Sequence, residues 1–151
     1  MILNDLLTRQ NVFSKIALQD GDKELPKALK VKVMRIRMAY AKIKKAFEEE
    51  VQEFTKELMT DEFQALGTNS ERTESEQARY EELVNKFNSE YQEFMTQKGL
   101  EEVADIDDSL TMEEYSDILD VNSGIEVEIN GHKVPTTDFM EVVMELFVSE
   151  E

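Results

Sequence analysis

The chain lacks several residue types and patterns on which common functions depend. It has no cysteine and a single histidine, which excludes disulfides, thiol chemistry and cysteine-based zinc sites. Its five glycines are scattered, so there is no glycine-rich phosphate loop. No run of about 18 apolar residues occurs, and the segment beginning Met1-Ile2-Leu3 has no basic stretch followed by an apolar core. We therefore expect neither a membrane span nor a signal peptide.

Catalytic and metal-binding patterns are also missing. His132 is expected beside a turn, with no nucleophile or ligand set near it in sequence. A calcium loop started at Asp105 puts Leu110 where an EF-hand needs glycine, and one started at Asp120 puts glycines at ligand positions. Neighbouring carboxylates are too frequent to be informative. We expect no enzyme activity, no metal site and no cofactor.

Charge is distributed unevenly over the 151 residues. The net charge is −17, but residues 1–99 carry only −2, whereas residues 100–151 carry −15 with Lys133 as their one cation. Such a field disfavours nucleic acid and anionic membranes and favours basic partners. The simpler alternative is an acidic surface that keeps the protein soluble.

One long amphipathic helix dominates the pattern. It is predicted to open at Pro26, where a missing N–H costs nothing, and to run to about Phe63. Residues 27–45 contain eight Lys or Arg and no acid, whereas acids crowd the later half. Its apolar stripe is Leu29, Val33, Ile36, Tyr40, Ile43, Phe47, Val51, Phe54 and Leu58.

A second helix is predicted from Thr73 or Ser75 to Gly99, with early acids that suit its N-terminus. The loop of about ten residues between the two helices favours an antiparallel hairpin with the apolar stripes facing each other. Because the second helix is shorter, it should end opposite about residue 38. The exposed start of the long helix is then left for other elements to cover. The second stripe is Tyr80, Leu83, Val84, Phe87, Tyr91, Phe94 and Met95.

Shorter elements flank this hairpin. We predict an N-terminal helix over residues 4–18, capped by Asn4 or Asp5, and a polar turn over 19–24. Thr111 begins a capping box for a helix through about Leu119.

The C-terminal part alternates apolar and acidic residues over 124–129, which is typical of a half-buried strand. Asn130-Gly131 favours a type I′ hairpin into a short strand at 132–134. A last helix over 138–147 should be capped by Thr136 or Thr137.

The expected fold is therefore mainly α. It consists of a long antiparallel helical hairpin with a short N-terminal helix, and a small C-terminal module with a β-hairpin and a helix. Residues 1–99 form the hairpin domain and residues 100–151 an acidic module packed on it. The alternative is that both form one single domain.

The basic half of the long helix has a second apolar side. At about 100° per residue, Val31, Met34 and Met38 lie nearly opposite the main stripe. Either another part of the chain covers this side, or it binds a partner or another copy. These three residues are candidates for protein interaction. The predicted strand, whose edge can pair with a neighbour, adds Ile125, Val127 and Ile129.

The order of parts resembles a group of small uncharacterised accessory proteins of tailed bacteriophages. The shared layout is a short helix, the segment 24–29 (Glu-Leu-Pro-Lys-Ala-Leu), a basic helix running into Phe47 and three glutamates, a second helix, the acidic strand 125–129 and a final helix. The resemblance implies a phage-encoded protein, in the virion or in the cytoplasm of the infected host.

We accordingly expect a non-enzymatic structural or assembly component of the virion that acts through protein–protein contacts, with itself or with other virion proteins, as an oligomer or part of a larger assembly. Nucleic acid is not an expected partner, because the basic residues surround the helix and do not form one stripe. The alternative is an acidic inhibitor that mimics nucleic acid and occupies a basic site on a host protein. A metal-dependent enzyme built on paired helices is disfavoured, because the stripes contain no inward-facing carboxylates.

Overall fold

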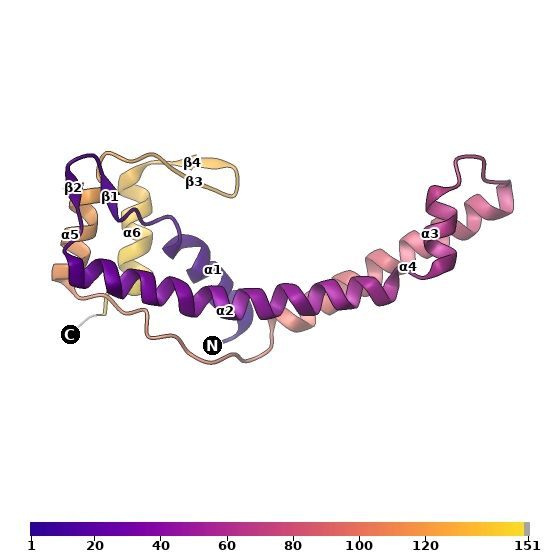
Figure 1. Ribbon diagram of the computed structural model, residues 1–151, viewed down its shortest axis with the longest axis horizontal. Coiled ribbons are helices and arrows are strands. Elements are labelled where there is room, and N and C mark those ends of the chain that lie inside the picture. Colours follow the sequence, from indigo (N-terminus) through magenta and orange to yellow (C-terminus); the bar gives the residue numbers. More distant parts are fainter. Residues whose placement is uncertain (150–151) are drawn as a thin grey trace.

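The computed structural model describes residues 1–149 and shows an elongated molecule with a compact head and a projecting stalk (Figure 1). The head holds α1 (Leu3–Phe13), α5 (Met112–Asn122), α6 (Thr136–Phe147) and two small β-hairpins. The stalk holds α3 (Asp61–Thr68) and α4 (Glu74–Gly99). The longest helix, α2 (Lys27–Leu58), runs through both parts. The predicted fold class, mainly α with mixed α and β structure at the C-terminal end, is confirmed.

Helix α2 begins as predicted, with Pro26 at its N-cap. Its predicted end near Phe63 is wrong, because the helix stops at Leu58 and the chain turns at Met59. The Thr60 side chain accepts a hydrogen bond from the Phe63 N–H and so caps the separate helix α3. A hydroxyl followed by two acids satisfies the free amide groups of a new helix, which favours the interruption.

The stalk is the predicted antiparallel hairpin, with apolar stripes face to face. Thr73 and Glu76 form a reciprocal capping box that starts α4. The rings of Phe54 and Phe94 stack with centroids 4.1 Å apart. Phe63 meets Tyr80 edge to face at 5.8 Å, so aromatic contacts join all three stalk helices.

The register of the hairpin differs from the prediction. Lys98, at the end of α4, pairs with Glu50, so α4 ends opposite residue 50 and not residue 38. Helix α3 accounts for the difference, because the first half of α4 packs against Phe63 of α3 and only the second half lies beside α2. The first part of α2, residues 27–49, is therefore not covered by α4 and lies along one side of the head.

The head has one hydrophobic core to which both ends of the chain contribute. Phe13 of α1 contacts Tyr40 of α2 and, edge to face at 5.1 Å, Phe147 of α6. The fully buried side chains therefore come from residues before Lys42 and after Asp108, and residues 100–149 share their core with the N-terminal helices. The largest of them are Tyr40, Phe13, Phe139, Phe147, Leu6, Ile16, Leu110, Ile118 and Met140.

Both β-hairpins belong to the head. β1 (Gln19–Asp20) pairs with β2 (Lys23–Glu24) around Gly21, where only a turn had been predicted. β3 (Val127–Ile129) pairs with β4 (His132–Val134), shorter than the predicted strand over 124–129. Asn130 and Gly131 have φ of 52° and 79°, so the predicted type I′ turn is confirmed.

Four details at the ends of helices depart from prediction. α1 ends at Phe13, because the buried side-chain amide of Asn122 holds both the N–H and the carbonyl of Ala17 in a non-helical segment. Neither Asn4 nor Asp5 caps α1, whose N-cap is Ile2. α6 begins at Thr136, whose hydroxyl donates to the Ile125 carbonyl at 2.7 Å and so links the helix to the segment just before β3. α5 extends three residues beyond the predicted end at Leu119.

Candidate functional site

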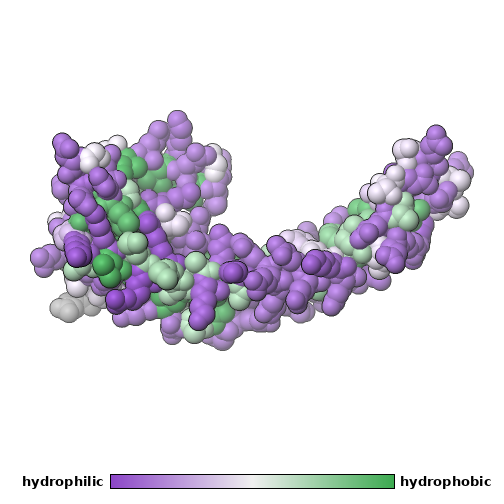
Figure 2. All heavy atoms as spheres, in the orientation of Figure 1, coloured by the Kyte–Doolittle hydropathy of each residue, from purple (hydrophilic) through white to green (hydrophobic). Residues whose placement is uncertain are grey.

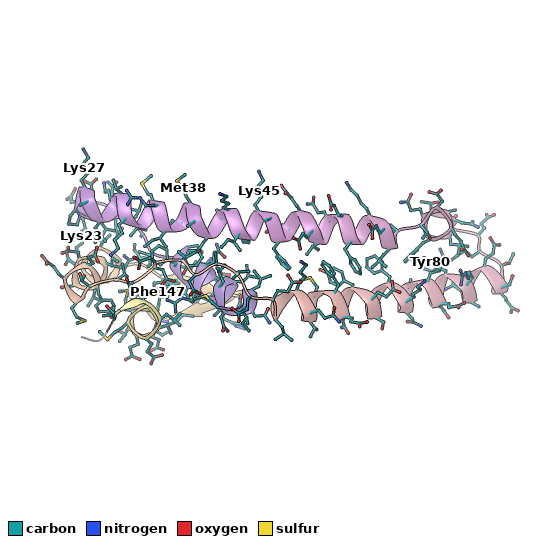
Figure 3. The ribbon with its side chains drawn as sticks, turned by 90° about the horizontal axis from the view of Figure 1, so that it is seen from below. Lys23, Lys27, Met38, Lys45, Tyr80 and Phe147 are labelled. Carbon is teal, nitrogen blue, oxygen red and sulfur yellow. The ribbon has the colours of Figure 1, made fainter. Side chains whose placement is uncertain are left out.

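The most distinctive surface is the side of α2 that faces away from the head. Leu29, Val33, Ile36 and Tyr40 point into the core, so the residues about half a turn away must face solvent. Val31 is 45% exposed, Met34 52% and Met38 73%. None of the three is covered by another described part of the chain. In Figure 3, Lys27, Met38 and Lys45 all point away from the body of the molecule.

We call this surface the outward face of α2. It consists of seven exposed side chains, three of them apolar and four basic, along five turns of helix: Lys27, Val31, Met34, Arg35, Met38, Lys42 and Lys45. Figure 2, in which α2 lies in front, shows green and pale-green spheres among purple ones along the head end of the helix.

The basic residues of the outward face are not neutralised internally. Among residues 1–149, Lys27, Arg35, Lys42 and Lys45 take part in no ion pair. The neighbouring cations on the flanks are used by the fold. Lys32 pairs with Glu114 at 2.7 Å, Lys30 with Glu24, and Lys44 lies 4.0 Å from Glu48. Positive charge therefore concentrates where the apolar side chains are exposed.

Arg37 lies at the edge of this surface, between α1 and α2. It donates to the Ile16 carbonyl, while its buried Nε has no hydrogen-bond partner among the described residues. Burial lowers the pKa of its guanidinium group. An adjoining cavity of about 280 Å³ is lined by Gln10, Phe13, Ser14, Tyr40 and Ala41 as well as Arg37.

A buried charged cluster stabilises the head behind this face. Arg9 donates to both oxygens of Asp108, at 2.8 and 2.7 Å, and the Tyr40 hydroxyl donates to the same carboxylate. The Asp108 side chain is 7% exposed. Burial, and then the hydrogen bond to Asp108, raise the pKa of Tyr40, while the hydrogen bond to Asp108 raises that of Arg9. Each group is satisfied within the fold, which indicates a structural role.

A shallow groove lies where head and stalk meet. It has a volume of about 520 Å³ and forms where the segment after α4 runs beside α2. Charged residues of both helices, Lys42, Glu50 and Lys98, also line it. Lys42 belongs to the outward face as well, so groove and face are continuous. The apolar lining is Leu3, Ala39, Ile43, Ala46, Phe47, Val103, Ala104 and Ile106.

The second set of predicted interaction residues lies elsewhere, on the side of the head that carries β3. Val127 is 3% exposed and packs into the core, so its side chain is not available to a partner. Ile125 and Ile129 are half-buried. The structure therefore does not bring Ile125, Val127 and Ile129 together with the outward face of α2. On this side of the head, the surfaces left to a partner are the backbone edge of the hairpin and the exposed parts of Ile125 and Ile129.

Within residues 1–149, no group of three or more His, Asp or Glu side chains is arranged to hold a metal ion. His132 lies exposed on β4. No described helix combines the length and apolar character needed to cross a membrane.

Comparison with known proteins gave no family model, no curated protein and no solved structure that matches this chain.

Proposed function

We propose that this protein is a non-enzymatic structural or assembly component that binds other protein through the outward face of α2. The observation that carries the proposal is the exposure of Val31, Met34 and Met38 on a helix whose opposite side is fixed in the core. Exposed methionines at helical spacing adapt to differently shaped surfaces, and they bury a large apolar area when a partner binds.

The geometry of the outward face favours binding of another protein over chemistry on a small substrate. The face is convex and lies on a continuous helix of 32 residues, which holds the seven side chains in a fixed relation. Contacts between helices use apolar residues three, four and seven positions apart, the spacing found here. The surrounding cations favour a partner with acidic residues beside its own apolar ones.

The assembly setting we propose is a tailed-phage particle or its assembly in the infected cell. Support for it comes from the layout of the sequence, in which a basic-then-acidic helix enters after Leu25-Pro26 and an acidic hairpin and helix follow. The stalk adds a long projecting element whose tip lies far from the head (Figure 1). In a repeated assembly, the head would bind a protein partner while the stalk extends away from that contact.

A second candidate is an acidic inhibitor that mimics nucleic acid. It is favoured by eight acids in residues 100–149 that form no ion pair within the described part of the chain. These acids are spread over α5, β3, α6 and the segment before α5. Since this candidate does not use the exposed methionines, mutation of the outward face separates it from the first.

The test is site-specific photo-crosslinking in cells that produce the particles. A crosslinker at Met38 should join the protein to a particle component or to another copy. The matched control is a crosslinker at Gln52, which is exposed on the same helix beyond the basic segment. The double variant Met34→Glu/Met38→Glu should lose incorporation while its circular dichroism is unchanged. Absence of the protein from purified particles, together with no crosslink from Met38, would overturn the proposal.

A further inference from the structure

Helix α5 carries a surface that complements the outward face of α2. Tyr115, Ile118 and Val121 bury one side of α5 in the core, which leaves Met112 57% exposed and Leu119 39% exposed on the other. We call the exposed side the α5 face: Met112, Glu113, Ser116, Leu119 and Asp120.

The two faces match in spacing. Met112 and Leu119 are seven residues apart, as are Val31 and Met38. Seven residues make two helical turns, so each pair is separated by about 10.5 Å along its helix. Met34 lies between the second pair, and it is opposite Ser116 when the two helices run antiparallel. A larger side chain on one face thus meets a smaller one on the other.

The two faces also match in charge. Glu113 and Asp120 flank the apolar pair on α5 and form no ion pair within residues 1–149. Arg35 and Lys42 flank the apolar row on α2 and are equally unpaired among those residues. Opposite charges that border a desolvated apolar strip select a partner and fix its orientation.

We propose that the outward face of α2 in one copy of this chain binds the α5 face of a second copy. The inference rests on the proposed function and names the partner. One chain cannot join its own two faces, because α5 is held against α2 through Lys32 and Glu114 with its buried side turned inward. Two α2 faces cannot pair either, since residues 27–45 contain eight cations and no acid.

A contact between two different surfaces leaves one of each unused at the ends of a dimer. Association of this kind continues into a ring or an open chain of copies. Each contact is one helix on one helix, smaller than the interfaces of stable dimers, so it should be weak in dilute solution and weaken further with salt. Repetition along an assembly strengthens it, which fits a component present in many copies.

The test uses two variants of the full chain, each with one face disabled. Met34→Glu/Met38→Glu disables the outward face of α2, and Met112→Glu/Leu119→Glu disables the α5 face. Leu100→Glu is the control, because Leu100 is 61% exposed and belongs to neither face. Analytical ultracentrifugation at low salt measures association, and circular dichroism confirms that each variant is folded.

The wild-type protein and Leu100→Glu should associate progressively as concentration rises, and each double variant alone should stay monomeric. An equimolar mixture of the two double variants should form a dimer and nothing larger, because only one functional pair of faces remains. A wild-type protein that stays monomeric at millimolar concentration would overturn the inference, as would association that persists in either variant. Crosslinking of Met38 to a different protein would then still support the proposed function.

Discussion

Arg9 and Asp108 form a bidentate ion pair that joins α1 to the segment before α5, although the two residues are 99 positions apart in the sequence. The guanidinium also lies 4.8 Å from the centre of the Phe147 ring, so the same side chain contacts the last helix. With the Tyr40 hydroxyl on the same carboxylate, three helices and one loop meet at Asp108. The arrangement explains how a chain with a surplus of acids buries one of them.

Replacing Asp108 should therefore destabilise the head strongly. Asp108→Ala leaves Arg9 and the Tyr40 hydroxyl without their acceptor, and the loss of one partner of a buried pair costs about 3–5 kcal/mol. The free energy of unfolding in urea measures the effect. The control is Glu62→Gln, which breaks the solvent-exposed pair with Arg79 and should change the free energy of unfolding very little, because water screens exposed ion pairs. Equal losses in both variants would contradict the structural role given to Asp108.

The raised pKa of Tyr40 predicts a loss of stability in alkali. Burial and the Asp108 carboxylate both oppose ionisation of the phenol in the folded protein. An unfolded tyrosine ionises near pH 10, so the folded state holds a proton that the unfolded state releases. The stabilisation is complete below about pH 10 and declines above it, by about 1.4 kcal/mol per pH unit for one proton.

Comparison with Tyr40→Phe isolates this effect from other alkaline titrations. The difference in unfolding free energy between wild type and Tyr40→Phe should be constant up to about pH 9 and should shrink at higher pH. Tyr115, whose pKa burial also raises, contributes equally to both proteins. A difference that does not change with pH would show that the folded protein does not oppose ionisation of the Tyr40 phenol.

Gly99, at the end of α4, leaves room for the Asn4 side chain of α1. A Cβ built on Gly99 would lie 2.5 Å from Cγ of Asn4, well inside contact distance. Gly99→Ala should therefore push the exposed Asn4 side chain aside, at a cost of about 0.5–1 kcal/mol, at the low end of overpacking. The double variant Asn4→Ala/Gly99→Ala should recover most of that loss, as measured by thermal unfolding. A loss that persists in the double variant would show that Asn4 is not the group for which Gly99 leaves room.

Local chemistry made part of this fold predictable from sequence. Pro26, the Thr73 and Thr111 capping boxes and the Asn130-Gly131 turn each determine their own element, and all appear where expected. The orientation of Val31, Met34 and Met38 followed from helical geometry alone. Whether another element covers them depends on the register of the stalk, which no local pattern specifies.

The features that were missed depend on distant contacts or on weak local signals. The cluster around Asp108 joins positions about 70 and 100 residues apart, which sequence spacing does not show. The α5 face could have been found, since Met112 and Leu119 are seven apart among acids. The interruption at Met59 also had a signal, because Thr60 followed by Asp61 is a typical helix start.

The cap at Thr60 gives a direct test of that interruption. Thr60→Ala removes the acceptor of the Phe63 N–H and should lower stability by about 0.5–2 kcal/mol. Thr96→Ala is the matched control, because Thr96 is exposed near the C-terminal end of α4 and alanine is the better helix former. Urea unfolding should separate the two variants. No loss in Thr60→Ala would mean that α2 can continue through this point.

The stalk should open more readily than the head. Buried residues of α2 end at Tyr40, and the one buried residue of α4 is Gly99 at its end. The stalk is therefore held together by half-buried aromatic side chains around the buried Phe63 of α3. Regions with few buried contacts exchange their amide hydrogens through local opening at lower free energy. Hydrogen exchange followed by mass spectrometry should show faster exchange in residues 50–95 than in α5 and α6. Phe94→Ala, which removes the stack with Phe54, should speed exchange in the stalk and leave the head unchanged. If the variant instead speeds exchange everywhere, α2 couples head and stalk into one cooperative unit.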